Sequence, residues 1–311
     1  MIKLLNFYFN IMYDLIAIGS IRVDLYFKGS SFTIKDGRFF LANGGKYFAE
    51  NLRVGVGGGA ANIAAGLAHF GYRTAAVAKV GGVFKQIIHD NLTKKNISSE
   101  FLQEEKDFIS VSAVVLSPSG ERMIISHNTD MTDLLNESMF HQLKKSKAVF
   151  FSNLYQIPLH MREKTADFLK KNWVKVLVNL GVKDCRRPSS EIKKYLEKID
   201  HLFLNCHEFA DLVRVPYEKI DFKYNVVQKY LPFFKNILVL TDGANGSYGY
   251  RGGEVFYQEA IKPRVIVDTT GAGDGYTCGF IAEYLKNEDM EKSMLSGANY
   301  AAHILGKLGA N

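Results

Sequence analysis

The sequence predicts an α/β protein in which a mostly parallel sheet lies between two layers of helices, with a small β-sheet lid beside it. Apolar runs of strand length alternate with amphipathic stretches along most of the chain. Continuous apolar strands separated by helices are typical of a parallel sheet that is covered on both faces. Two stretches, 23–56 and 108–128, break this rhythm, and we assign them to the lid.

The elements of the main layer follow from these apolar patterns in chain order. The predicted strands are Tyr13–Gly19, Thr74–Val80, Ala148–Ser152, Val174–Asn179, His201–Leu204 and Asn236–Thr241. The predicted helices are Ala60–Phe70, Met161–Lys171, Glu191–Lys198, Ala272–Lys286 and Glu291–Leu305.

The lid is expected because its two stretches do not fit a parallel sheet. Residues 23–56 are rich in aromatic, glycine and polar residues, and Phe108–Asn128 reads as two strands joined by the turn Ser117–Gly120. A flap over the carboxyl ends of parallel strands would cover a ligand crevice. We therefore expect one domain over residues 1–311, with both lid segments inserted into it.

The balance of charge does not indicate a nucleic-acid surface. The formal net charge is +7, but the basic residues are scattered pairs such as Lys144-Lys145 and Lys193-Lys194. Acidic residues lie close to several pairs, as Glu191 and Glu197 do here, so we expect solvated helix faces. We expect no nucleic-acid partner, although a basic balance also suits anionic substrates such as nucleotides.

Cysteine content and apolar runs indicate the cellular compartment of the protein. Cys185, Cys206 and Cys278 are too few and too far apart for a zinc site or a disulfide framework, so we expect a reducing, cytoplasmic setting. No apolar run is long enough to span a membrane. The apolar start Met1–Asn10 lacks a small-residue cleavage site, so we interpret residues 1–11 as a non-native beginning rather than a signal peptide.

The strongest chemical signal is Asp268-Thr-Thr-Gly-Ala-Gly-Asp274, which precedes a predicted helix. Successive N–H groups of a Gly-Ala-Gly turn at a helix N-terminus can hold the anion that develops during phosphoryl transfer. An aspartate in that first turn could accept a proton from an attacking hydroxyl. From spacing alone, Asp274 is equally compatible with an aspartate that merely favours the helix dipole.

Six motifs in order resemble the signatures of the PfkB, or ribokinase-like, carbohydrate kinases. The resemblance covers nearly the whole chain from residue 13, and it implies the ribokinase-like three-layer α/β/α fold. The motifs are Ile18–Asp24, Gly57–Ala64, Ser117–Arg122, Asn205–Glu208, Leu240–Gly246 and Asp268–Asp274.

The resemblance implies an ATP-dependent kinase that phosphorylates a hydroxyl of a small sugar or sugar derivative. Asp274 would be the catalytic base, and the amides of Gly271, Ala272 and Gly273 would form the anion hole. The sugar site would be lined by Asp24, Gly58 and Asn62.

The same resemblance implies ATP and Mg²⁺ as cofactors, with a monovalent cation such as K⁺ as a further candidate. ATP would contact Thr241, Gly243, Gly246 and Asn299. Mg²⁺ would be held through water by Asn205 and Glu208, and the monovalent cation at Asp268 and Thr270. Read alone, Asn205 and Glu208 also fit a helix cap. A homodimer through the apolar outer surface of the lid is plausible from its aromatic and valine residues, which are Phe27, Phe32, Phe39, Phe40, Val111 and Val114.

Three alternatives stay open at the level of sequence. A nucleoside kinase of the same family is one, because the aromatic segment 25–48 could stack a base. Gly59 stands where ribokinase proper has lysine, which argues against ribose. A non-catalytic sensor would not need Asp274, and a dehydrogenase would need a strand and an acid around Gly55–Ala60 that the sequence lacks.

Overall fold

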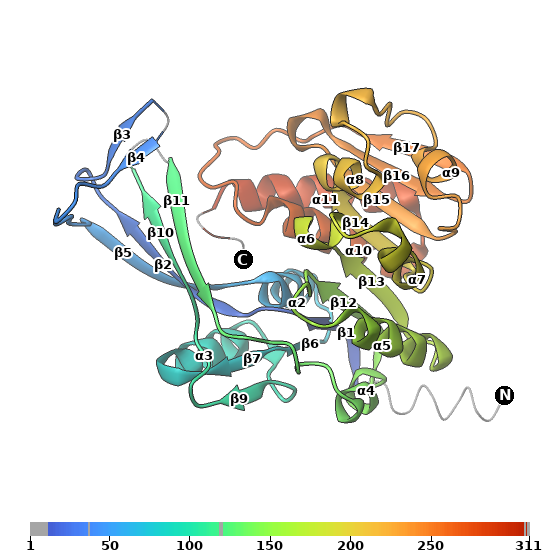
Figure 1. Ribbon diagram of the computed structural model, residues 1–311, viewed down its shortest axis with the longest axis horizontal. Coiled ribbons are helices and arrows are strands. Elements are labelled where there is room, and N and C mark those ends of the chain that lie inside the picture. Colours follow the sequence, from blue (N-terminus) through green and yellow to red (C-terminus); the bar gives the residue numbers. More distant parts are fainter. Residues whose placement is uncertain (1–11, 37, 118–120, 308, 310–311) are drawn as a thin grey trace.

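A nine-stranded mixed sheet forms the body of the protein (Figure 1). The computed structural model describes residues 12–36, 38–117, 121–307 and 309, so residues 1–11 and most of the predicted turn at 117–120 lie outside the described residues. The strand order is β17-β16-β15-β14-β13-β12-β1-β6-β8. Pairing is parallel from β8 to β15 and antiparallel at β16 and β17. The predicted mostly parallel sheet is therefore confirmed.

The bounds of the sheet strands stay close to the predicted apolar runs. They are β1 (Tyr13–Ile18), β6 (Thr74–Val77), β8 (Ile97–Ser98), β12 (Ser146–Ser152), β13 (Lys175–Asn179), β14 (His201–Asn205), β15 (Ile237–Thr241), β16 (Ser247–Arg251) and β17 (Glu254–Gln258).

Side chains of one strand alternate between two cores, because successive residues point to opposite faces of a sheet. In β1, Ile16 and Ile18 join one core while Leu15 and Ala17 join the other. The first core is covered by α4 (Glu137–Leu143), α5 (Leu159–Lys171), α6 (Val182–Cys185), α7 (Ser189–Leu196), α8 (Cys206–Val213) and α9 (Val226–Tyr230). The second is covered by α2 (Gly59–His69), α3 (Lys85–Lys94), α10 (Ala272–Asn287) and α11 (Met290–Leu305).

The lid strands project from this body as a separate arm in Figure 1. Four of them form a sheet in the order β11-β10-β2-β5, and two more form a ribbon. Their bounds are β2 (Arg22–Lys28), β3 (Thr33–Lys35), β4 (Arg38–Phe40), β5 (Asn51–Gly57), β10 (Ser110–Leu116) and β11 (Arg122–Asn128).

The predicted strand Thr74–Val80 is two strands in the structure. After β6, the chain leaves the main sheet, and β7 (Lys79–Gly81) pairs with β9 (Gln103–Glu105) instead. Lys79 explains the break, because its buried ammonium lies 2.8 Å from Glu105 and 2.6 Å from Asp133, both outside the main sheet. The chain then turns through the 3₁₀ helix η1 (Gly82–Phe84) into α3.

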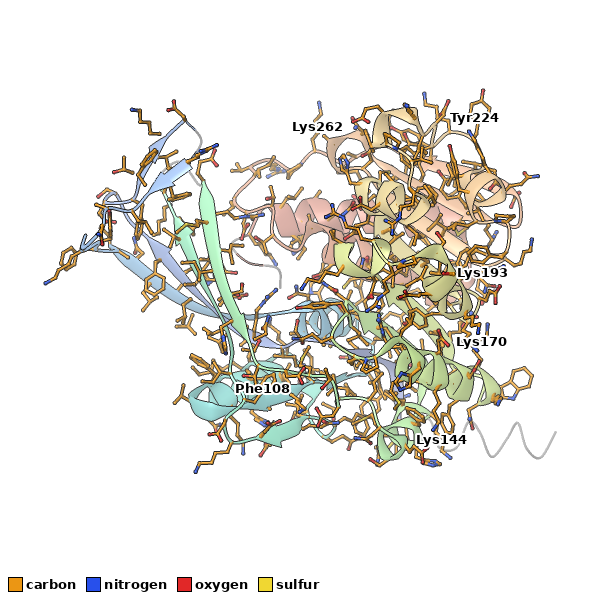
Figure 2. The ribbon with its side chains drawn as sticks, in the orientation of Figure 1. Phe108, Lys144, Lys170, Lys193, Tyr224 and Lys262 are labelled. Carbon is orange, nitrogen blue, oxygen red and sulfur yellow. The ribbon has the colours of Figure 1, made fainter. Side chains whose placement is uncertain are left out.

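Surface lysines sit on separate helices of the body. Figure 2 shows Lys144, Lys170 and Lys193 spread over the outer helices, where all three are exposed. The basic pairs therefore lie on solvated helix faces, as their acidic neighbours predicted. Among the described residues, none of the helices combines the length and apolar character needed to cross a membrane.

Candidate active site

The carboxyl ends of three neighbouring strands and the start of α10 enclose a cleft of about 190 Å³. Parallel strands place their carboxyl ends at one edge of a sheet, which is where such folds bind ligands. The cleft is lined by Asn179, Phe203, Leu204, Asn205, Glu208, Val239, Thr241, Gly273, Asp274 and Thr277. The structure thus brings together predicted catalytic, nucleotide and metal residues that are far apart in sequence.

Helix α10 begins at this cleft with a left-handed residue. Gly271 has φ 77° and ψ 5°, a conformation that glycine adopts without a steric penalty. The N–H of Gly275 donates the first turn's hydrogen bond to the Gly271 oxygen at 2.7 Å. The N–H groups before it, at Ala272 and Gly273, have no intrahelical acceptor and lie at the positive end of the helix dipole. A side chain added at Gly273 would meet nothing within 4 Å, so this turn is open to a ligand.

Asp274 lies in the first turn of α10, half-buried, and accepts a hydrogen bond from Asn62. The distance from Asn62 Nδ2 to Asp274 Oδ2 is 2.7 Å. Burial raises the pKa of Asp274, while the Asn62 hydrogen bond and the charge of Arg22 oppose that rise. A carboxylate with a raised pKa that is still held in its ionised form by a donor is a suitable general base.

Asp24 faces the same region from the inner face of the lid. Burial raises its pKa, opposed by the charge of Arg22 and a hydrogen bond from Ser112. A side chain at Gly57 would lie 2.3 Å from Asp24 Oδ2, so only glycine leaves room for this carboxylate. Gly58 has φ 95°, and its missing Cβ would come within 2.4 Å of the Ser20 oxygen. These two glycines let β5 pass closely over β2 and lead directly into α2.

Asn205 and Glu208 form a reciprocal cap at the start of α8. The N–H of Glu208 donates to Asn205 Oδ1 at 2.8 Å, and the N–H of Asn205 donates to Glu208 Oε2 at 2.9 Å. Burial raises the pKa of Glu208, and the charges of Asp211 and Asp274 add to this. The cap accounts for one oxygen of Glu208, and the cleft is open to the rest of its side chain.

A direct protein cage for a metal is not found in the described part of the chain, where no three His, Cys, Asp or Glu side chains form a metal site. Mg²⁺ commonly keeps several waters and uses few protein carboxylates alongside substrate phosphates. The neighbouring negative groups Glu208 and Asp274 suit such a water-mediated ion.

The turn after β15 carries Thr241, Gly243 and Gly246. Thr241 ends β15 in the cleft, and the short 3₁₀ helix η3 (Gly243–Asn245) follows it. Gly246 has φ 97°, and a Cβ there would lie 2.3 Å from the Gln258 oxygen, so the turn packs closely on the end of β17. Asp242 is held by the hydroxyl of Tyr217 at 2.8 Å.

Asp268 and Thr270 are joined to the lid by Arg122. The guanidinium of Arg122, on β11, donates to Asp268 Oδ1 and to Thr270 Oγ1. Asp268 Oδ1 also accepts from the Thr270 N–H at 2.8 Å, and Oδ2 accepts from the Gly309 N–H at 3.1 Å. These donors and the positive charge hold the pKa of the Asp268 carboxyl below its ordinary value, although burial opposes them.

Asn299 lies apart from the other predicted nucleotide residues. It is exposed on α11, where its Nδ2 donates to the Leu295 oxygen at 3.0 Å. It borders a separate shallow hollow of about 460 Å³ between α2 and α11, together with His69, Tyr300 and His303. The structure does not bring Asn299 and Thr241 into one cleft.

Two residues of the region were not singled out by sequence. Asn179 ends β13 and lines the cleft, donating to the Phe203 oxygen at 3.0 Å. Its position at the end of a predicted strand, beside the Asn205 strand, was a usable signal. Arg22 opens β2 and stands 3.7 Å from Asp24, which no local pattern in the sequence indicates.

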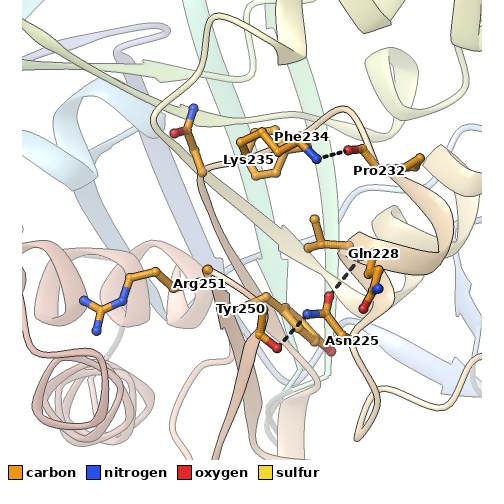
Figure 3. A pocket seen from close by; sticks show the side chains of 11 residues that line it. Asn225, Gln228, Pro232, Phe234, Lys235, Tyr250 and Arg251 are labelled. Atoms are coloured by element: carbon orange, nitrogen blue, oxygen red, sulfur yellow. Dashed lines mark hydrogen bonds between the residues drawn. The ribbon is translucent and has the colours of Figure 1, made fainter.

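A further pocket, of about 360 Å³, lies at the opposite edge of the sheet (Figure 3). Its lining includes Asn236, just before β15, and the turn between β16 and β17. The polar groups there bind one another: Asn225 donates to the Gly253 oxygen at 2.9 Å and Lys235 to the Pro232 oxygen at 2.6 Å. Its lining residues include no group with an obvious catalytic role, so the Asp274 cleft is the candidate active site.

Comparison with known proteins identifies the family to which this chain belongs. The profile of the pfkB family of carbohydrate kinases matches residues 12–311. The chain therefore belongs to the pfkB family of carbohydrate kinases. Kinases of this family act on sugars or nucleosides and use ATP, generally with Mg²⁺.

Individual relatives have different names. The chain is 26% identical over 305 residues to a nucleoside kinase from Methanocaldococcus jannaschii, covering 94% of this chain and 91% of that protein. It is 26% identical over 271 residues to a 5-dehydro-2-deoxygluconokinase from Bacillus licheniformis, covering 81% of each. The solved structure of Arabidopsis thaliana ribokinase with ribose and ATP has a TM-score of 0.79 at 22% identity, covering 96% of this chain and 94% of that one. The predicted ribokinase-like fold is confirmed.

Proposed function

We propose that this protein transfers the γ-phosphoryl group of ATP to a hydroxyl of a small sugar or sugar derivative, with Asp274 as the base. The observation that carries the proposal is the position of Asp274. Its carboxylate is held by Asn62 in the first turn of α10, next to the open amides of Ala272 and Gly273. A proton acceptor and an anion-binding turn therefore meet at one end of one cleft.

The reaction uses these groups in one in-line step. Asp274 accepts the proton of the substrate hydroxyl while the oxygen of that hydroxyl forms a bond to the γ-phosphorus. The bond between that phosphorus and the β–γ bridging oxygen breaks, and ADP leaves. The amides of Gly271, Ala272 and Gly273 stabilise the charge on the transferring group.

The remaining predicted residues complete this arrangement. ATP would lie along Thr241, Gly243 and Gly246. Asn299 is a weaker part of this nucleotide site, because it borders a separate hollow. Asn205 and Glu208 would hold Mg²⁺ through water, and the ion would supply positive charge to neutralise the phosphates. A monovalent cation at Asp268 and Thr270 is a weaker part of the proposal, because both side chains already bind Arg122.

The polarity of the lid favours a polyol over a nucleoside. Cross-strand register and alternation place Asp24, Ser112 and Ser126 on the inner face, with Ser112 and Ser126 hydroxyls 2.9 Å apart. Phe27 lies on the outer face by strand alternation, and Phe32 stacks on Tyr47. Tyr26 shares the inner face with Asp24, but its ring is buried in a cluster with Val114 and Leu116. The nucleoside kinase relative keeps a nucleoside as the second candidate substrate.

The test is an ATP-consumption screen with Mg²⁺ over neutral sugars, sugar acids, sugar phosphates and nucleosides. We expect one sugar class to support turnover at least about tenfold above the best nucleoside. Preference for a nucleoside would replace the first candidate by the second. Absence of turnover with all four classes, from folded protein, would contradict the kinase proposal.

We also propose a homodimer through the outer face of the lid. This face is formed by apolar side chains that include the exposed Leu52, Val54 and Ile125. Val114, which the sequence suggested for the same surface, is instead buried on the inner face. Sedimentation should show a dimer that Ile125→Asp dissociates and that Trp173→Asp, at an exposed apolar residue of the body, leaves intact.

A single domain in a reducing, cytoplasmic setting is the remaining proposal. The body and lid share the continuous run from β1 through β2, and all three cysteines are buried free thiols. One cooperative unfolding transition, unaffected by reductant, is the expected result.

A further inference from the structure

Arg22 places a guanidinium at the inner face of the lid. It opens β2 two residues before Asp24, so alternation puts both side chains on the same face of the strand. Its Nε lies 3.7 Å from Asp24 Oδ1, and one third of its side chain is exposed (33%). The guanidinium therefore stands at the mouth of the proposed substrate site and not in the protein core.

Arg22 is linked to the proposed base through Asp24 and Asn62, which border the same gap at Gly57. The space left by Gly57 separates Asp24 from Asn62: a Cβ there would lie 2.3 Å from Asp24 Oδ2 and 4.0 Å from Asn62 Oδ1. Asn62 in turn holds Asp274 at 2.7 Å. The charge of Arg22 lowers the pKa of both Asp24 and Asp274. A substrate that touches Asp24 and Asp274 therefore also lies within reach of Arg22.

The N–H donors of Arg22 are not used up by its neighbours. The 3.7 Å between Arg22 Nε and Asp24 Oδ1 is short enough for an ion pair but too long for a hydrogen bond. This is the ion pair that the guanidinium makes within the described residues. Other arginines of this protein donate hydrogen bonds to acceptors within the protein. Arg162 donates twice to Asp184, at 2.6 and 3.0 Å, and Arg214 donates to three backbone oxygens. Among these three, only the Arg22 side chain makes no hydrogen bond to the described residues, so its fork of donors is available to a ligand.

We propose that the substrate is a polyhydroxylated sugar acid whose carboxylate is bound by Arg22 while Asp24 binds its hydroxyls. This inference rests on the proposed function. A planar guanidinium binds a carboxylate through two parallel hydrogen bonds, which suits this fork. A sugar phosphate shares the oxyanion chemistry, but it carries a second negative charge. One guanidinium beside Asp24 and Asp274 compensates a monoanion better.

The test compares matched substrates with and without the anionic group. Initial rates are measured for five- and six-carbon aldonates and keto-sugar acids, for the matching neutral sugars, and for their phosphates. The variant is Arg22→Gln, and the control is Arg73→Gln. Arg73 Nε also lies 3.7 Å from an aspartate, Asp14, but at the far end of β1. Arg22→Lys serves as a second variant, since it keeps the charge and loses the fork.

The expected result is that a sugar acid is the best substrate of the wild type. Arg22→Gln should lower kcat/KM for the sugar acid about 100-fold, which is at least about tenfold more than its effect on the matching neutral sugar. The effect of Arg22→Lys should fall between those of the wild type and Arg22→Gln. Arg73→Gln should change neither rate.

Four outcomes would overturn the inference. An equal loss for acid and neutral sugar, with a shifted pH profile, would mean that Arg22 only tunes Asp274. A neutral sugar or nucleoside as best substrate would remove the sugar acid but keep the kinase. If a sugar phosphate is the best substrate, then the proposed substrate class, a sugar acid with a single negative charge, is wrong. No turnover with any class would remove the kinase itself.

Discussion

Asn62 Nδ2 lies 2.7 Å from Asp274 Oδ2 and so joins the first turn of α2 to the first turn of α10. The two residues belong to motifs that are 212 positions apart in the chain. Their contact orients the proposed base toward the region between the lid and the body. It also provides a donor that favours the ionised form of a carboxylate whose burial favours the neutral one.

Replacing Asp274 with Asn should lower kcat by about 10²- to 10⁴-fold, because the hydroxyl loses its proton acceptor. ATP affinity, measured by titration calorimetry, should stay within about threefold, since the shape of the turn is kept. Asp289→Asn is the matched control, because Asp289 caps α11 at a distance from the cleft and Asn also caps well. Equal turnover of Asp274→Asn and wild type would mean that Asp274 only favours the helix dipole.

Asn62→Ala should move the acid limb of the kcat/KM profile to higher pH. The hydrogen bond lowers the pKa of Asp274, so its loss raises that pKa and leaves less of the base ionised at a given pH. We expect a loss of roughly ten- to hundredfold at neutral pH, the size of a lost bond to a charged group. Asn287→Ala removes a bond of the same chemistry, to the partly exposed Glu283 at 2.8 Å, and should leave the profile unchanged. An unmoved acid limb in Asn62→Ala would show that another group titrates.

The sequence was sufficient for the parts of this site that local motifs specify. The Gly271–Asp274 turn requires a left-handed glycine followed by a helix, and both features can be predicted from the local sequence. Arg22 was missed because its role depends on how β2 registers with β5 and on the gap at Gly57. Arg122 ends a motif that the sequence shows, but its partner Asp268 lies 146 residues away. Pairings of this kind are set by how the lid sits against the body, which periodicity does not encode.

Arg122 and Asp268 should show a measurable coupling in a double-mutant cycle. The pair links β11 of the lid to the segment that leads into α10, with Asp268 almost fully buried. We expect unfolding free energies of Arg122→Met, Asp268→Asn and the double variant to give a coupling of about 1 kcal/mol or more. This is at the modest end for buried pairs, because about a third of the Arg122 side chain is exposed (32%). Strict additivity would mean that the lid is held by other contacts.

Glu208→Gln should separate the cap from the metal. Glutamine can still accept the Asn205 N–H, so the free energy of unfolding should change by less than about 1 kcal/mol. The Mg²⁺ concentration for half-maximal rate should rise about tenfold, because a carboxylate suits a hydrated Mg²⁺ better than an amide. Asn136→Ala, which removes the cap of α4, should instead cost about 1 kcal/mol and leave the Mg²⁺ dependence alone. If the Mg²⁺ dependence of Glu208→Gln is unchanged, then Glu208 only caps α8 and does not position the metal.

His201 should make the fold sensitive to acid. The ring is buried at the start of β14, edge-on to Tyr284 at 4.8 Å, and its Nδ1 has no hydrogen-bond partner among the described residues. Burial, with a smaller contribution from the charge of Lys175, lowers the pKa of His201 to about 3.

Below its unfolded pKa of about 6.5, the unfolded chain binds a proton that the native state does not, so stability falls as the pH falls from there towards 3. Between pH 7 and pH 5 this linkage amounts to about 2 kcal/mol. The free energy of unfolding, measured in urea, should fall by about 2 kcal/mol less in His201→Phe than in the wild type between pH 7 and pH 5. His160→Phe, at an exposed histidine, should behave as the wild type does. If His201→Phe keeps the full acid sensitivity, then His201 is protonated in the folded protein and its ring must reach solvent.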